Sequence, residues 1–188
     1  PLGSILTIAA AGSEMSNSCV ITNEEGWYKK ALDTDLARPK FAIMNPEITY
    51  TLPDYQTQCG CADIMMHTME RYFVLEDTME ITDKIAQDVM KNVMKYAKIL
   101  KKDPENYEAR AEIMWCGSLS HNGLTGCGTC GGDWATHLIE HELGGMFDVA
   151  HGAGLAAVWG SWARYVMDEK PERFAQFAVD VMGVEESD

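Results

Sequence analysis

Hydrophobic residues recur with a helical period over most of the chain that follows Pro53. Between Ile81 and Leu100 they stand at three- and four-residue steps, which is typical of an amphipathic helix with one buried face. Similar but shorter patterns predict helices over residues 61–74, 104–119, 134–143, 152–167 and 171–182. The second part of the chain is therefore expected to be all helical.

Capping and breaking residues predict where several of these helices begin and end. Asp103 is expected to cap the helix that starts at Pro104, since aspartate suits the N-cap and proline the first helical position. Asp133 is expected to cap the helix over 134–143, and the two glycines at 144–145 to end or bend it. The glycine-rich stretch 123–132 predicts a loop.

Before Pro53 the pattern changes to short β-branched or apolar runs separated by turn residues. Residues 5–9, 19–22 and 41–44 are predicted to be strands, and residues 23–26 a turn between two of them. The fold class expected is mainly α, with a short β-rich segment over residues 1–52 followed by a helical domain over residues 53–188.

The charge balance excludes two classes of partner. Lys and Arg total 15 against 29 Asp and Glu, which gives a formal net charge of -14. Nucleic-acid binding needs clustered cations, and an anionic membrane surface would repel this chain, so neither partner is expected. No apolar run reaches the roughly 18 to 20 residues of a membrane span, and no signal peptide is recognised.

The six cysteines are expected to be free, as in a cytoplasmic protein, because a chain of this length can build a core without disulfides. A minor alternative is a four-thiolate zinc site that joins the pair at Cys59 and Cys61 to the pair at Cys127 and Cys130. The simpler explanation is that both pairs lie among glycines, where small residues suit a tight backbone.

Histidine is scarce, with five residues in the chain, and four of the five fall in two patterns. Asp63 and His67 stand four residues apart on a predicted helix, and so do His137 and His141, with His151 further along. Such a set of nitrogen and oxygen donors suits zinc or ferrous iron. Solvated helix pairs would show the same spacing, so pattern alone leaves both interpretations open. His121 is expected to be a loop or capping residue.

One familiar motif is excluded. The string His-Leu-Ile-Glu-His at 137–141 spaces its histidines as in a zinc protease, but the glutamate stands at the fourth position instead of the second. Its carboxylate would therefore point away from the place of a general base.

Several separated strings resemble the iron-containing alcohol dehydrogenase family, most closely its butanol dehydrogenase-like branch of NADPH-dependent aldehyde reductases. They are Leu-Thr-Ile-Ala-Ala-Ala-Gly-Ser-Glu at 6–14, Thr-Tyr-Thr-Leu-Pro at 49–53, Asp-Pro-Glu-Asn-Tyr at 103–107, Asp-Trp-Ala-Thr-His at 133–137, and the histidine spacing itself. They occur in the family's order along the whole chain.

The resemblance implies an α/β dinucleotide-binding domain followed by an all-helical metal-binding domain. Residues 1–52 would be the end of the first and residues 53–188 most of the second, truncated at its C-terminus. The chain starts at Pro1 with an apolar run close behind, and its helical pattern breaks off near its last residues. It is therefore expected to be a piece of a longer protein, without the family's diphosphate-binding loop.

The resemblance also implies roles for individual residues. The metal ligands, for Fe(II) or Zn(II), would be Asp63, His67, His137 and His151, and His141 would face substrate and nicotinamide as the catalytic histidine. Contacts to NADPH or NADH would come from Thr7, Ser16, Lys29 and Ile48, with Lys30 as an alternative to Lys29. Ala11 stands where the family usually has threonine, which removes one hydroxyl near the cofactor.

The function implied is hydride transfer between NAD(P)H and a small aldehyde or primary alcohol, by an enzyme that is a homodimer at full length. Two alternatives remain: a non-catalytic helical metal-binding or assembly domain, and another reaction of the dehydroquinate-synthase-like superfamily. The strings at 6–14 and 133–137 favour the reductase branch.

Overall fold

Helices dominate the computed structural model, which describes residues 2–185. The helices are α1 (Asp54–Tyr72), α2 (Glu80–Leu100), α3 (Tyr107–His121), α4 (Ala135–Phe147), α5 (His151–Val166) and α6 (Pro171–Asp180). The strands are β1 (Gly3–Ile5), β2 (Ser18–Asn23), β3 (Tyr28–Asp33) and β4 (Phe41–Ile43), all of them before the first helix. The mainly α class with a short β-rich start is thus confirmed. Pro1 and residues 186–188 lie outside the described part.

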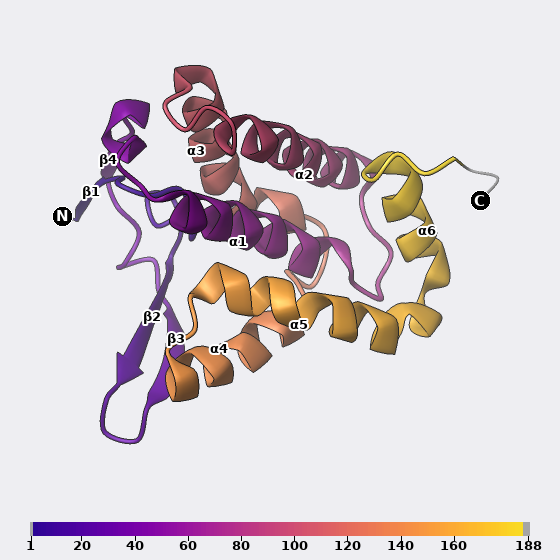
Figure 1. The fold of residues 1–188 in the computed structure, drawn as a ribbon. Coiled ribbons are helices and arrows are strands. Elements are labelled where there is room, and N and C mark those ends of the chain that lie inside the picture. Colours follow the sequence, from indigo (N-terminus) through magenta and orange to yellow (C-terminus); the bar gives the residue numbers. More distant parts are fainter. Residues whose placement is uncertain (1, 186–188) are drawn as a thin grey trace.

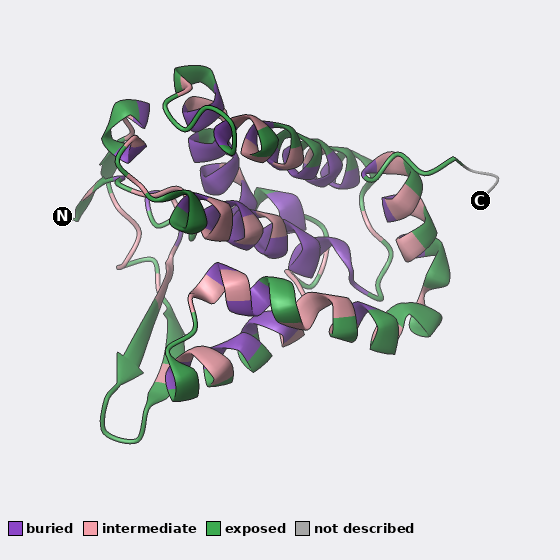
Figure 2. Cartoon of the chain, viewed as in Figure 1, coloured by how far each residue is buried: buried purple, intermediate pink, exposed green. Residues whose placement is uncertain are grey.

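Helix α1 lies at the centre of the bundle, with α2 and α3 on one side and α4 and α5 on the other (Figure 1). Two clusters of buried side chains hold these layers together, as the inward-facing surfaces in Figure 2 show. One cluster joins α1, α2 and α3 through residues such as Ile64, Val93 and Ile113. The other joins α1 and α2 to α5 and α6 through Tyr72, Leu155 and Phe177. No helix among residues 2–185 is long and apolar enough to cross a membrane.

Helix α6 is fastened to the bundle by a buried ion pair. Arg173 donates to both carboxylate oxygens of Asp83, each at 2.6 Å, and to the backbone carbonyl of Tyr72 at 2.8 Å. Both charged side chains are buried, and each finds its partner in the other, as buried charges require.

The strands form two small sheets. β1 pairs in parallel with β4, with Ile5 opposite Ile43, and β2 pairs with β3 in an antiparallel hairpin, with Ser18 opposite Asp33. The hairpin projects from the bundle and β3 packs against α4 (Figure 1). The strand expected over 5–9 ends at Ile5, and β3 was not expected, because its sequence Tyr-Lys-Lys-Ala-Leu-Asp lacks a clear alternation. The turn at 23–26 connects β2 to this unpredicted strand.

The loop after β1 docks onto α3 through the string at 6–14. Gly12 has a φ of +58°, and a Cβ at this position would lie 2.8 Å from the carbonyl oxygen of Gly117. The hydroxyl of Ser118 donates to the buried carboxylate of Glu14 at 2.5 Å. Gly12 therefore allows the loop to approach α3 closely, and Glu14 forms a hydrogen bond that holds the loop against this helix.

Three expected helix boundaries are wrong. α1 begins at Asp54, seven residues before the expected start at Cys61. α3 begins at Tyr107, where the side chain of Asn106 accepts a hydrogen bond from the Ala109 amide, so the expected cap at Asp103 is wrong. The N-cap of α4 is Trp134, in the left-handed region, while Asp133 accepts a hydrogen bond from the Ala135 amide at 3.0 Å.

Helix α4 continues through Gly144 and Gly145 to Phe147, so the expected break is also wrong. The glycines serve packing instead. A Cβ on Gly145 would lie 2.5 Å from the carbonyl oxygen of Trp27 in the hairpin, and a Cβ on Gly144 would lie 2.8 Å from Nζ of Lys29. Two glycines in a row thus let the hairpin lie directly on the helix.

Candidate metal centre

Asp63, in the middle of α1, lies where three helices meet. Its Oδ1 atom is 3.5 Å from Nδ1 of His67 on the same helix, 3.6 Å from Nε2 of His137 on α4, and 3.5 Å from Nε2 of His151 at the start of α5. Asp63, His67 and His137 are all buried, and His151 is partly open to solvent. The structure therefore brings together the four residues predicted as ligands.

The distances in this cluster suit a shared cation better than hydrogen bonds. In a tetrahedral shell with metal–ligand bonds of about 2.1 Å, neighbouring ligand atoms stand about 3.4 Å apart. Oδ1 of Asp63, Nδ1 of His67 and Nε2 of His137 are buried and have no hydrogen-bond partner among the described residues. Buried polar atoms without partners are costly, and three imidazoles with one carboxylate are ligands that zinc and ferrous iron accept. The residues fit a divalent cation.

Two buried carboxylates orient the histidines of α4 and α5. Oε1 of Glu70 accepts from the backbone amide of His137 at 2.9 Å and lies 3.0 Å from its Nδ1. Oε2 of Glu140 contacts Nδ1 of His151. An ionised carboxylate can only accept, so each Nδ1 carries a proton and each Nε2 faces Asp63.

These two glutamates were missed by sequence reasoning, although a signal was present. Glu70 stands seven residues after Asp63 and three after His67, on the same face of α1. The carboxylate of Glu140 points away from the place of a protease base, as its position in the string predicts, and contacts His151 and Lys29. A carboxylate among the apolar residues of these helices indicates a buried partner.

A second layer of side chains backs His67. The ring of His121 lies 3.9 Å from the ring of His67, centroid to centroid, and its Nδ1 is 3.1 Å from Nη2 of Arg71. The guanidinium of Arg71 stacks on Trp134 at 4.5 Å. His121 is the last residue of α3, so it does not lie in the loop, and it belongs to the histidine cluster.

The electrostatics of the cluster favour a negative Asp63 among cations. Burial opposes its charge, yet the neighbouring imidazoles of His67, His137 and His151 hold the pKa of Asp63 well below its usual value. Burial alone would lower the pKa of His151, but Asp63 and Glu140 raise it to about 9. Burial, helped by the nearby Lys29 ammonium, lowers the pKa of His141 to about 4, so His141 is neutral at pH 7.

The remaining predicted residues lie at different distances from this cluster. His141 is one turn beyond His137 on α4, with ring centroids 6.4 Å from His137 and 5.7 Å from His151. Nζ of Lys29, on β3, lies 3.1 Å from Glu140 and 3.4 Å from Nδ1 of His151, whereas Lys30 lies over the ring of Tyr28. Thr7 and Ile48 are exposed, and Ser16 is buried, with its hydroxyl accepting from the Ser18 amide.

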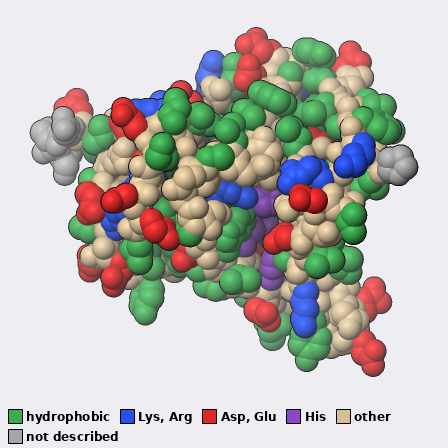
Figure 3. All heavy atoms as spheres, turned by 180° about the vertical axis from the view of Figure 1, so that it is seen from behind, with side chains coloured by type: hydrophobic (Ala, Val, Ile, Leu, Met, Phe, Trp, Pro, Cys, Tyr) green, Lys and Arg blue, Asp and Glu red, His purple; other side chains and the backbone are tan. Residues whose placement is uncertain are grey.

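The face that Figure 3 shows is hollowed, and histidine side chains lie at the bottom of the hollow. The exposed part of His151, about a third of its side chain at 31%, gives the cluster its access to solvent. Behind His67, Arg71 is buried, while His121 and Trp134 are partly exposed, as His151 is on the other side.

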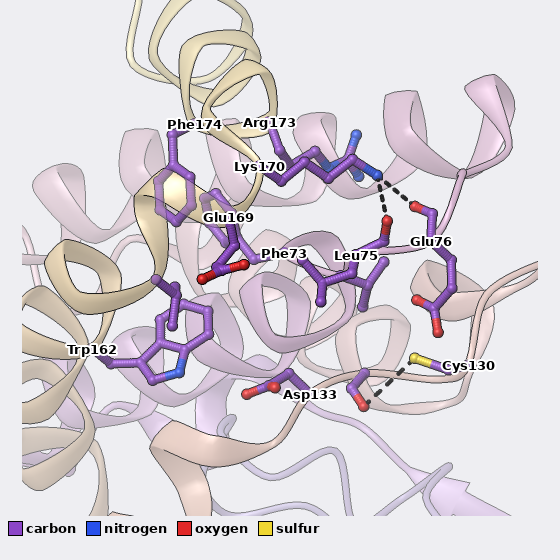
Figure 4. Close-up of a pocket in the computed structure, with 13 residues that line it drawn as sticks. Phe73, Leu75, Glu76, Cys130, Asp133, Trp162, Glu169, Lys170, Arg173 and Phe174 are labelled. Atoms are coloured by element: carbon purple, nitrogen blue, oxygen red, sulfur yellow. Dashed lines mark hydrogen bonds between the residues drawn. The ribbon is translucent and has the colours of Figure 1, made fainter.

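A separate pocket of about 370 Å³ lies between the end of α1, α5 and α6. Figure 4 shows its apolar wall of Phe73, Trp162 and Phe174, and Lys170 bonded to the carbonyl oxygens of Leu75 and Glu76. None of the predicted site residues lines it.

The thiolate alternative finds no support. All six cysteines are free, with Cys127 and Cys130 exposed and Cys61 buried. The side-chain groups among residues 2–185 that could hold a metal consist of histidine and carboxylate only.

A helical bundle with a buried centre of three imidazoles and one carboxylate defines a candidate metal-binding protein. The family model for the Fe-containing alcohol dehydrogenase family, C-terminal, matches residues 57–188. The chain belongs to this family.

Similar proteins share both sequence and fold. The chain is 39% identical over 188 residues to NADH-dependent butanol dehydrogenase A of Clostridium acetobutylicum, covering 100% of this chain and 48% of that protein. It is 34% identical to the NADPH-dependent aldehyde reductase YqhD of Escherichia coli over 99% of this chain and 48% of that protein. The crystal structure of NADH-dependent butanol dehydrogenase A from Thermotoga maritima matches with a TM-score of 0.96 and 39% identity, over 98% of this chain and 46% of that one. The chain spans about half the length of these relatives.

Proposed function

We propose that the protein is an NAD(P)-dependent, metal-containing alcohol dehydrogenase or aldehyde reductase for a small aldehyde or primary alcohol. The observation that carries the proposal is the single carboxylate oxygen of Asp63 with three imidazole nitrogens 3.5 to 3.6 Å away. Asp63, His67, His137 and His151 would hold Fe(II) or Zn(II). The reaction is taken from the names of relatives that cover this chain from end to end.

When bound, a divalent cation supplies a Lewis acid for the carbonyl oxygen, and a nicotinamide cofactor supplies the hydride. The residues of this chain supply position and proton transfer. Glu70 and Glu140 hold His137 and His151 with Nε2 toward Asp63. His141, next to the partly open His151, moves the proton to or from the substrate oxygen at a ring nitrogen.

Cofactor contacts are proposed for Thr7, Ser16, Lys29 and Ile48. The Lys29 ammonium lies 3.1 Å from Glu140 and 3.4 Å from Nδ1 of His151, which supports a place for its charge beside the bound cofactor. Both NADH- and NADPH-dependent proteins are among the relatives, and either cofactor is compatible with the proposal. We also propose a cytoplasmic homodimer, and the six free cysteines support the location.

Metal-dependent turnover tests the function. The protein as its natural gene encodes it is assayed for NADH and NADPH oxidation with butyraldehyde. The assay is run before and after a chelator removes bound metal. We expect activity to disappear with the metal and to return with Fe(II) or Zn(II). Turnover that survives complete metal removal would contradict the proposal. A protein that holds its metal and reduces no aldehyde would favour the non-catalytic metal-binding alternative.

A further inference from the structure

Glu140 is the most deeply buried carboxylate beside the cluster, with none of its surface exposed. It stands on α4, three residues after His137, and reaches across to α5 and to the hairpin. Its Oε2 atom contacts Nδ1 of His151, and Nζ of Lys29 lies 3.1 Å from the same oxygen and 3.5 Å from Oε1. One side chain thus joins α4, α5 and β3.

The contact with His151 determines what that histidine presents to Asp63. Nδ1 of His151 has two neighbours, the Glu140 carboxylate and, farther away at 3.4 Å, Nζ of Lys29. A carboxylate accepts hydrogen bonds and donates none, so the shorter contact with Glu140 favours a proton on Nδ1. When the ring is neutral, its Nε2 atom, 3.5 Å from Oδ1 of Asp63, then offers its lone pair to a cation. Glu140 fixes both the tautomer and the ring orientation.

The surroundings of Glu140 are shaped to admit its carboxylate. A Cβ on Gly144 would lie 2.9 Å from Oε1, and a Cβ on Gly154 would lie 2.8 Å from Cγ. Any larger residue at these positions would crowd the glutamate. Lys29 supplies the positive charge that a buried carboxylate needs.

We propose that Glu140 is a positioning residue for His151 at the metal centre, held in place by Lys29 and by the space at Gly144 and Gly154. This inference rests on the proposed metal centre. It assigns to Glu140 a role in metal affinity, exerted through His151 and without contact to the metal.

The first test compares zinc affinities, measured by competition with a chromophoric chelator, for the wild type and three variants. Glu140→Gln keeps the size of the side chain and removes its charge, and it should weaken zinc binding about 10- to 100-fold, as loss of a ligand's orienting partner does. Glu142→Gln, an exposed glutamate on the same helix, is the charge-matched control and should bind zinc as the wild type does. Asp63→Asn should lose the site.

The outcomes separate this inference from the proposed function. Unchanged affinity in Glu140→Gln, with loss in Asp63→Asn, would overturn the positioning role and leave the metal centre intact. Equal weakening in Glu140→Gln and Glu142→Gln would show a general charge effect and overturn it as well. A wild type that binds no zinc would overturn both proposals.

A second measurement needs no variant and so holds if Glu140→Gln fails to fold. Nitrogen-15 NMR of histidine side chains in the zinc-loaded wild type should show His151 with a protonated Nδ1 and zinc at Nε2. Zinc at Nδ1 of His151 would overturn the proposal.

Discussion

At the scale of single residues, the site depends on one carboxylate oxygen. Oδ1 of Asp63 is the atom that the nitrogens of His67, His137 and His151 share, and it has no hydrogen-bond donor among residues 2–185. His141 stands one turn away from this arrangement, although its spacing from His137 made it an equal candidate from sequence. Its ring lies beside His151 instead, where Glu140, His141 and His151 form a second group of possible ligands.

We expect His151→Ala to lose bound metal, because it removes one of the nitrogens around Asp63. His141→Ala should keep the metal and lower turnover by about a hundred- to ten-thousand-fold, the usual contribution of a general acid or base. Metal content and turnover are measured on both variants of the natural gene product. An empty site in His141→Ala together with a filled site in His151→Ala would reverse the two roles.

At the scale of elements, glycines in helices show how packing overrides propensity. Gly145 lies under the hairpin, with a Cβ position 2.5 Å from the carbonyl oxygen of Trp27. Gly160 on α5 has only the guanidinium of Arg164 near its Cβ position, at 3.9 Å. The same substitution should therefore have opposite effects at the two positions.

Gly160→Ala should stabilise the fold by about 0.5–1 kcal/mol, since alanine is the better helix former. Gly145→Ala should destabilise it by about 1–3 kcal/mol, since the new methyl group forces the hairpin away from α4. Urea unfolding monitored by circular dichroism gives both free energies of unfolding. Stabilisation by both substitutions would show that the hairpin does not lie against α4 in solution.

The contrast between local sequence preference and packing also explains which elements were predictable. The apolar positions of α2 repeat so regularly that its expected range, 81–100, matches the observed Glu80–Leu100. β3 was missed because its residues are almost all exposed, so no buried face marks it in the sequence. The passage of α4 through two glycines follows from a contact with residues more than a hundred positions away, which local pattern cannot reveal.

At the scale of the whole molecule, the centre joins three helices that are distant in the sequence. Asp63 and His67 come from α1, His137 from α4 and His151 from α5. Glu140 connects the hairpin to this centre through its ion pair with Lys29. Spacing on one helix made the pairs Asp63–His67 and His137–His141 visible in the sequence. Glu70 shares a face of α1 with Asp63 and His67, so periodicity could have indicated it. The roles of Glu140, Arg71 and His121 depend on how helices pack, so sequence periodicity could not show them.

The most direct test of this account is the metal content of the protein purified without chelator, determined by elemental analysis. We predict one divalent ion per chain in the wild type and none in an Asp63→Ala, His137→Ala double variant that remains folded by circular dichroism. Stoichiometric metal in that double variant would contradict the assignment, and its loss on further replacement of Cys127 and Cys130 would place the metal on thiolates instead.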